Sequence, residues 1–77
     1  MDLGDIEATI EAGIPDATAT VTHARGPDDA DHLEATVVAA AFEDLSLLEQ
    51  HELVYDALGD LVTNEIHALE LTTRTPD

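Results

Sequence analysis

Cysteine is absent from this sequence of 77 residues. Its absence excludes disulfides, thiolate-only metal sites and a cysteine nucleophile. Lysine and tryptophan are also absent, and Phe42 and Tyr55 are the only large aromatic residues. Aliphatic side chains must therefore form the core. At this length we expect one domain, spanning residues 1–77.

Long apolar runs are missing too, and the N-terminus has no basic segment followed by an apolar one. The sequence therefore offers no candidate for a membrane-spanning helix or a signal peptide. We expect a cytoplasmic protein that does not enter a membrane.

Basic residues are almost missing. Arg25 and Arg74 stand against 18 Asp and Glu residues, which gives a formal net charge of −16. Such a surface repels itself and destabilises the compact state in dilute buffer. Salt near 1 M shortens the Debye length to about 3 Å and removes most of this penalty. We interpret the composition as that of an acidic, halophilic protein, and direct binding to nucleic-acid phosphates is disfavoured.

The first predicted element is a helix over residues 2–12, because apolar residues recur there at three- and four-residue steps. Glu7 and Glu11 are expected to face solvent. Asp2 can cap the N-terminus, and Gly13 fits the position just past the C-terminus.

Alternating apolar residues predict strands over residues 17–23 and 32–40. One loop, residues 24–31, joins them and is expected to be flexible, so the two strands should pair antiparallel. A third strand is predicted over residues 64–73. A long helical connection precedes it, which favours parallel pairing with the second strand.

The helical connection begins at a capping box formed by Ser46 and Glu49. Its apolar residues recur at helical spacing, and Gly59 raises the alternative of a split helix that ends near Asn64. Phe42 is the best candidate for a core anchor. The periodic apolar residues are Leu47, Leu48, Val54, Leu58, Leu61 and Val62. The predicted fold is α+β, a three-stranded mixed sheet with helices on one face, followed by a tail over residues 74–77.

Three of the four histidines fall at strand ends. His23 ends the first strand, His32 begins the second, and His67 begins the third on the face of Leu69 and Leu71. The predicted topology brings these three strand ends to one edge of the sheet. Imidazole suits zinc, copper, nickel and iron, so a mononuclear metal site made by the three is one interpretation.

A structural role is the alternative for each histidine. His67 can be a core-edge residue with a hydrogen-bond partner, and His23 a solvated loop residue. His32 can bond the backbone of its own turn, and His51, near a helix start, can be a neutral surface or capping residue. No catalytic constellation or phosphate-binding loop is present, so we do not expect an enzyme.

Several short pieces, in order, resemble the BolA family from about residue 6 to residue 76. No single piece is specific, but together they are. They are Ile14-Pro15-Asp16-Ala17, His23 with His32, Phe42-Glu43 with Ser46, His51 to Leu58, and Ile66-His67-Ala68-Leu69 with Thr73 to Pro76.

This resemblance implies a type II KH-like fold of order α-β-β-α-α-β. It also implies a partner protein that shares a 2Fe–2S cluster with a monothiol glutaredoxin, in cluster assembly, trafficking or iron sensing. The family's C-terminal histidine corresponds to His67, and its loop ligand to His23. His32 stays open as a third or replacement ligand. The glutaredoxin would bring sulfur ligands and a low-molecular-weight thiol.

The sequence departs from the family pattern at Gln50-His51-Glu52, where relatives often carry basic residues. The alternative function, a KH-like nucleic-acid-binding transcriptional regulator, loses support from this change. A Gly-x-x-Gly clamp, expected of RNA-binding KH domains, is also missing.

Overall fold

The computed structural model describes residues 2–26, 28, 32–59 and 68–76. Within these residues the chain forms two helices and three strands, with a short 3₁₀ turn between β2 and α2. In chain order they are α1 (Leu3–Gly13), β1 (Thr18–His23), β2 (His32–Val38), the 3₁₀ turn (Ala40–Phe42), α2 (Leu47–Leu58) and β3 (Ala68–Arg74).

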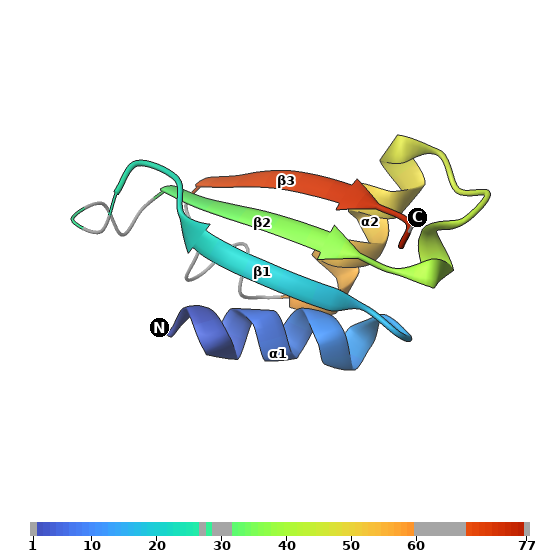
Figure 1. The fold of residues 1–77 in the computed structure, drawn as a ribbon, viewed down its shortest axis with the longest axis horizontal. Coiled ribbons are helices and arrows are strands. Elements are labelled where there is room, and N and C mark those ends of the chain that lie inside the picture. Colours follow the sequence, from blue (N-terminus) through green and yellow to red (C-terminus); the bar gives the residue numbers. More distant parts are fainter. Residues whose placement is uncertain (1, 27, 29–31, 60–67, 77) are drawn as a thin grey trace.

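The three strands form one mixed sheet in the order β1-β2-β3 (Figure 1). β1 and β2 pair antiparallel, and β2 and β3 pair parallel, as predicted. The strand bounds differ from the prediction by a residue or two. Residues 64–67, the predicted start of the third strand, lie outside the described residues.

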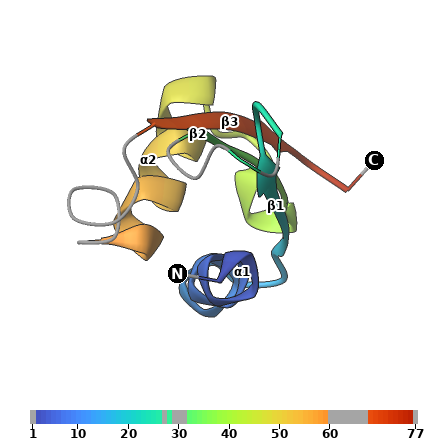
Figure 2. The same cartoon turned by 90° about the vertical axis from the view of Figure 1, so that its left-hand side faces the viewer.

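Both helices cover the same face of the sheet (Figure 2). The buried core lies between these layers and is almost entirely aliphatic, with Phe42 as its one aromatic member at 1% exposure. The alternation of the strands explains the layering, because Ala19, Val21 and Ala35 are buried while their neighbours Thr20 and Glu34 are exposed. The α+β prediction and the role of Phe42 are thus confirmed.

Glu11 of α1 is exposed, as expected, whereas Glu7 is half-buried, and the carboxylates of both accept hydrogen bonds from β1 that the sequence did not predict. The backbone N–H of Val21 donates to Glu7 Oε2 at 2.8 Å, and that of Ala19 donates to Glu11 Oε2 at 2.9 Å. Two helix residues four apart are separated by a rise of about 6 Å, close to the roughly 6.7 Å between strand residues two apart. The two carboxylates therefore match two successive outward N–H groups of the edge strand β1.

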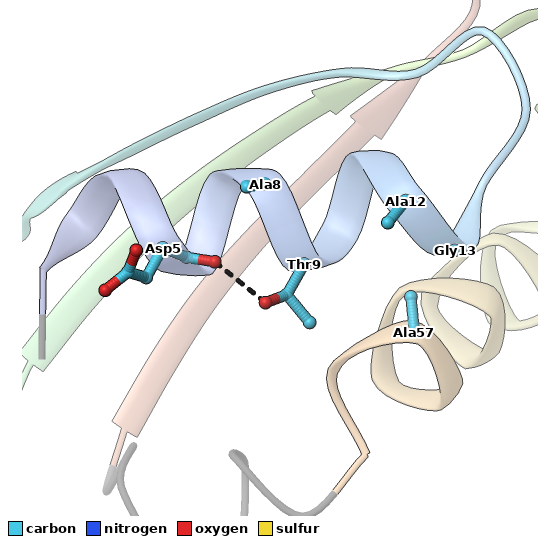
Figure 3. Close-up of a pocket in the computed structure, with 6 residues that line it drawn as sticks. All are labelled: Asp5, Ala8, Thr9, Ala12, Gly13 and Ala57. Atoms are coloured by element: carbon cyan, nitrogen blue, oxygen red, sulfur yellow. Dashed lines mark hydrogen bonds between the residues drawn. The ribbon is translucent and has the colours of Figure 1, made fainter.

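Gly13 is the last residue of α1, not the residue after it, and Ile14 is the C-cap. The glycine is needed for packing, since a Cβ there would lie 2.6 Å from Cβ of Ala57 in α2. This close approach forms one end of a shallow groove between the helices, drawn in Figure 3. Asp2 occupies the N-cap position of α1, but its side chain makes no capping hydrogen bond.

The predicted capping box opens α2: Glu49 N–H donates to Ser46 Oγ at 3.2 Å, and Ser46 N–H donates to Glu49 Oε1 at 3.0 Å. The Ser46 N–H, and secondly its hydroxyl, lower the pKa of Glu49. α2 is continuous to Leu58, and Gly59 caps it with a φ of +57°. The interruption at Gly59 agrees with the split-helix alternative, and the predicted end near Asn64 lies outside the described residues.

Leu47 and Leu48 are 63% and 71% exposed, so their assignment to the buried face of α2 is wrong. They precede the point at which the helix comes under the sheet, where Val54 and Leu58 are buried. Neither α1 nor α2 is long and apolar enough to span a membrane, and the search covers only the described part of the chain.

Candidate functional site

The site predicted from the histidines is the edge of the sheet where β1 ends and β2 and β3 begin. In the ladder His23 pairs with Leu33, and His32 pairs with Ala68. The N–H of Ala24 donates to the carbonyl oxygen of His32 at 2.9 Å, which closes the base of the β1–β2 loop. The predicted convergence of these three strand ends is confirmed by the pairing.

The two described histidines of this edge lie on opposite faces of the sheet. His23 continues the alternation of Ala19 and Val21, which face the helices, and it is half-buried. His32 precedes the buried Leu33 and so belongs to the uncovered face. The strand geometry alone therefore does not direct their imidazoles toward a common point.

His23 has an imidazole that the surrounding protein leaves unsatisfied. Its Nδ1 atom is buried and has no hydrogen-bond partner within the described residues. A metal-bound histidine normally needs a lone pair that no donor occupies, and its second nitrogen is held by an outer partner. Among the described residues His23 meets the first condition, as does Nε2 of His51, so the chemistry of His23 is compatible with a ligand and its place at the strand ends distinguishes it from His51. His32, in contrast, has an interaction of its own.

His67 lies outside the described residues, so its predicted position and face are untested. The residue that follows it, Ala68, is half-buried and begins β3 beside His32. No cluster of three or more His, Asp or Glu residues able to hold a metal ion occurs among the described residues, a set that omits His67.

His51 is on α2, where its Nε2 atom is buried and has no partner in the described part of the chain. It was expected to be a neutral surface or capping residue, and the structure places it half-buried. Its neighbour Gln50 accepts a hydrogen bond from Thr73 near the end of β3, whereas the other described histidines lie where β3 begins.

Glu7 is a contributor to the site that sequence reasoning missed. Its carboxylate holds the N–H of Val21, two residues before His23, and so fixes the end of β1 on which His23 sits. The signal was present in the sequence, since Glu7 and Glu11 are spaced four apart on a helix next to a predicted edge strand.

The groove between α1 and α2 in Figure 3 has a different character. Small side chains and the single carboxylate of Asp5 line it, and the Thr9 hydroxyl donates to the Asp5 carbonyl oxygen at 2.8 Å. It holds no histidine and so contributes no metal ligand of the predicted kind.

Comparison with known sequences gives a consistent result. A model of the BolA-like protein family matches residues 9–77. BolA-like protein 1 of Homo sapiens is 32% identical over 96% of this chain, and the match covers 61% of the human protein. SufE-like protein 1 of Arabidopsis thaliana is 36% identical over 75% of this chain, which is 16% of that protein. The chain thus spans less than two thirds of these relatives.

Comparison with known structures agrees. A BolA homologue from Coxiella burnetii superposes with a TM-score of 0.84 at 37% identity, covering 100% of this chain and 94% of that one. The BolA domain of SufE1 from Arabidopsis thaliana superposes with a TM-score of 0.78 at 27% identity, covering 96% and 91%. From its sequence and its fold, the chain belongs to the BolA-like protein family.

Proposed function

We propose that this chain is a non-enzymatic partner of a monothiol glutaredoxin, with which it shares a 2Fe–2S cluster. His67 and His23 supply the imidazole ligands, and the glutaredoxin and a small thiol supply sulfur. The observation that carries the proposal is the buried, unpartnered Nδ1 of His23 at the edge where β2 and β3 begin. Two histidines on a 2Fe–2S cluster have a precedent in Rieske centres.

Membership in the BolA-like family supports a partner role over catalysis. The residue composition agrees, since the absence of cysteine leaves histidine as the strongest ligand type for iron that the chain can offer. A shared cluster then requires thiolates from another protein. The BolA domain within SufE-like protein 1 shows that a domain of this fold can be joined to a second protein unit.

Nucleic-acid binding is the weaker candidate. The described surface of α2 carries Glu49, Glu52 and Asp56, all exposed, and has no lysine or arginine. With two arginines in the whole chain, few counterions could be released from phosphates on binding.

A visible circular-dichroism titration tests the proposal. Cluster-loaded monothiol glutaredoxin is titrated in molar salt with the wild-type protein and with His67→Ala, His23→Ala and His32→Ala. We expect a new spectrum that saturates at one-to-one, is lost with His67→Ala and is altered with His23→Ala. His51→Ala is the matched control, because it removes an imidazole from α2, and it should leave the spectrum unchanged.

An unchanged glutaredoxin spectrum on adding wild-type protein would refute cluster sharing. A spectrum that survives His23→Ala but not His32→Ala would move the second ligand to His32. If cluster sharing is refuted, retention on DNA in molar salt is the test of the alternative function.

A further inference from the structure

The two borders of the sheet differ. At the β1 border, Glu7 and Glu11 accept hydrogen bonds from the outward N–H groups of Val21 and Ala19. At the β3 border, no strand or side chain among the described residues pairs with the outward backbone groups. Figure 1 shows β3 along the upper border of the sheet, with no described strand beyond it. An unpaired strand edge is a template for another strand.

The direction of the backbone groups in β3 follows from one hydrogen bond. The N–H of Ala39 donates to the carbonyl oxygen of Arg74 at 3.0 Å, so Arg74 faces β2. Because successive residues of a strand alternate, the N–H and C=O groups of Leu69, Leu71 and Thr73 point away from β2. These three residues can therefore form an antiparallel ladder with an added strand.

We propose that the occupant of this border is a second copy of the chain, with its β3 antiparallel and the two-fold axis at Thr72. In this register Leu71 faces Thr73 of the second copy in a hydrogen-bonded pair. Glu70 then faces Arg74 of the second copy, since both lie two residues from Thr72 on the exposed face. Opposite charges on facing residues stabilise a strand pair.

The charge pattern selects this occupant and this register. Arg74 is one of two basic residues in a chain of net charge −16, and it lies on the strand whose outer edge is open. Within the chain, Glu70 lies beside Glu34 of β2, so two like charges are neighbours. A second copy would place an arginine against Glu70, and the symmetry would satisfy both arginines at once.

Exposed apolar residues lie at the same border. Leu48 is nine residues before Ala57 on α2, half a turn away from the side that contacts α1. The Thr73 hydroxyl donates to Gln50 Oε1 at 2.6 Å, which fixes the beginning of α2 next to the position of the axis. Leu47 and Leu48, the most exposed large apolar residues of the described chain, would be covered by the second copy.

Sedimentation equilibrium in molar potassium chloride tests the proposal, with salt chosen to screen the repulsion between two chains of −16. We expect a wild-type dimer. Glu70→Arg and Arg74→Glu each place like charges opposite each other twice, and each should raise the dimer dissociation constant by about tenfold or more. Asp28→Arg and Arg25→Glu make the same charge changes at exposed positions off the interface and should dimerise like wild type.

Mixing the two interface variants gives the sharper result. A pair made of one Glu70→Arg chain and one Arg74→Glu chain restores opposite charges at both positions, so the mixture should dimerise where each variant alone does not. The chain has no lysine, so an amine-reactive dye can label the N-terminus of one variant to follow the mixed species.

A monomeric wild type at millimolar concentration would overturn the proposal, as would interface variants that dimerise as well as wild type. Failure of the mixture to dimerise, with both variants folded by circular dichroism, would overturn the register. These outcomes are independent of cluster binding, because neither Glu70 nor Arg74 is a proposed ligand.

Discussion

Replacing Glu7 by alanine should destabilise the fold well beyond the usual effect of a helix surface substitution. The change removes the acceptor of the Val21 N–H, a 2.8 Å bond at a residue that is 3% exposed. A hydrogen bond to a charged group contributes about 1.5–3 kcal/mol, and a buried donor left without an acceptor costs a similar amount. We expect a loss of about 2 kcal/mol, or a melting temperature lower by about 10 °C.

The same reasoning gives a smaller loss for Glu11→Ala, about 1 kcal/mol, because Glu11 is more exposed. Glu7→Gln keeps an acceptor oxygen and should lose less than Glu7→Ala. Denaturant unfolding in molar salt measures each loss, and amide hydrogen exchange should show faster exchange at Val21 in particular.

Glu52→Ala is the matched control, since it removes the same charge from an exposed helix position. It should be close to neutral, because alanine favours helix and the chain carries excess negative charge. Equal stability of Glu7→Ala and Glu52→Ala, with unchanged exchange at Val21, would refute the role given to the carboxylate.

Three further changes test other parts of the fold. Gly13→Ala should lower the free energy of unfolding by about 1–3 kcal/mol, because its Cβ would meet Ala57 at 2.6 Å; an unchanged unfolding midpoint would contradict the close approach. Ser46→Ala should raise the lowered pKa of Glu49 only part of the way toward the ordinary glutamate value, because the backbone N–H of residue 46 still donates to the carboxylate. Since the folded pKa is depressed, this contribution to stability is present above the ordinary glutamate pKa and is lost as pH falls through the folded value; an NMR titration that shows full return would contradict the assignment. Gly59→Ala should cost about 1 kcal/mol or more by denaturant unfolding, because φ is +57° and ψ is −127° there, a backbone conformation open mainly to glycine; an unchanged unfolding midpoint would contradict this.

The sheet was predictable because its strands carry a two-residue apolar alternation that their burial reproduces. From this alternation and the lengths of the connections, the pairing of β1, β2 and β3 followed, and with it the meeting of three strand ends at one edge. The capping box was predictable since both of its hydrogen bonds are local.

The errors concern contacts between elements. The role of Glu7 depends on where α1 lies against β1, and the role of Gly13 depends on how closely α2 approaches, neither of which a helical period encodes. Leu47 and Leu48 fit the period of the helix but precede the part that packs under the sheet. The prediction that His23 ends the first strand is confirmed, but that His23 and His32 lie on opposite faces of the sheet is seen only from the strand register.

The carboxylates of Glu7 and Glu11 have a consequence for the size of any assembly. A filament built by strand addition needs two open sheet borders on every chain, because each chain must pair with one neighbour at each border. In this chain the β1 border is closed by its own helix. Two copies joined at β3 would therefore have no remaining open border, and growth would end at a closed, two-fold symmetric pair.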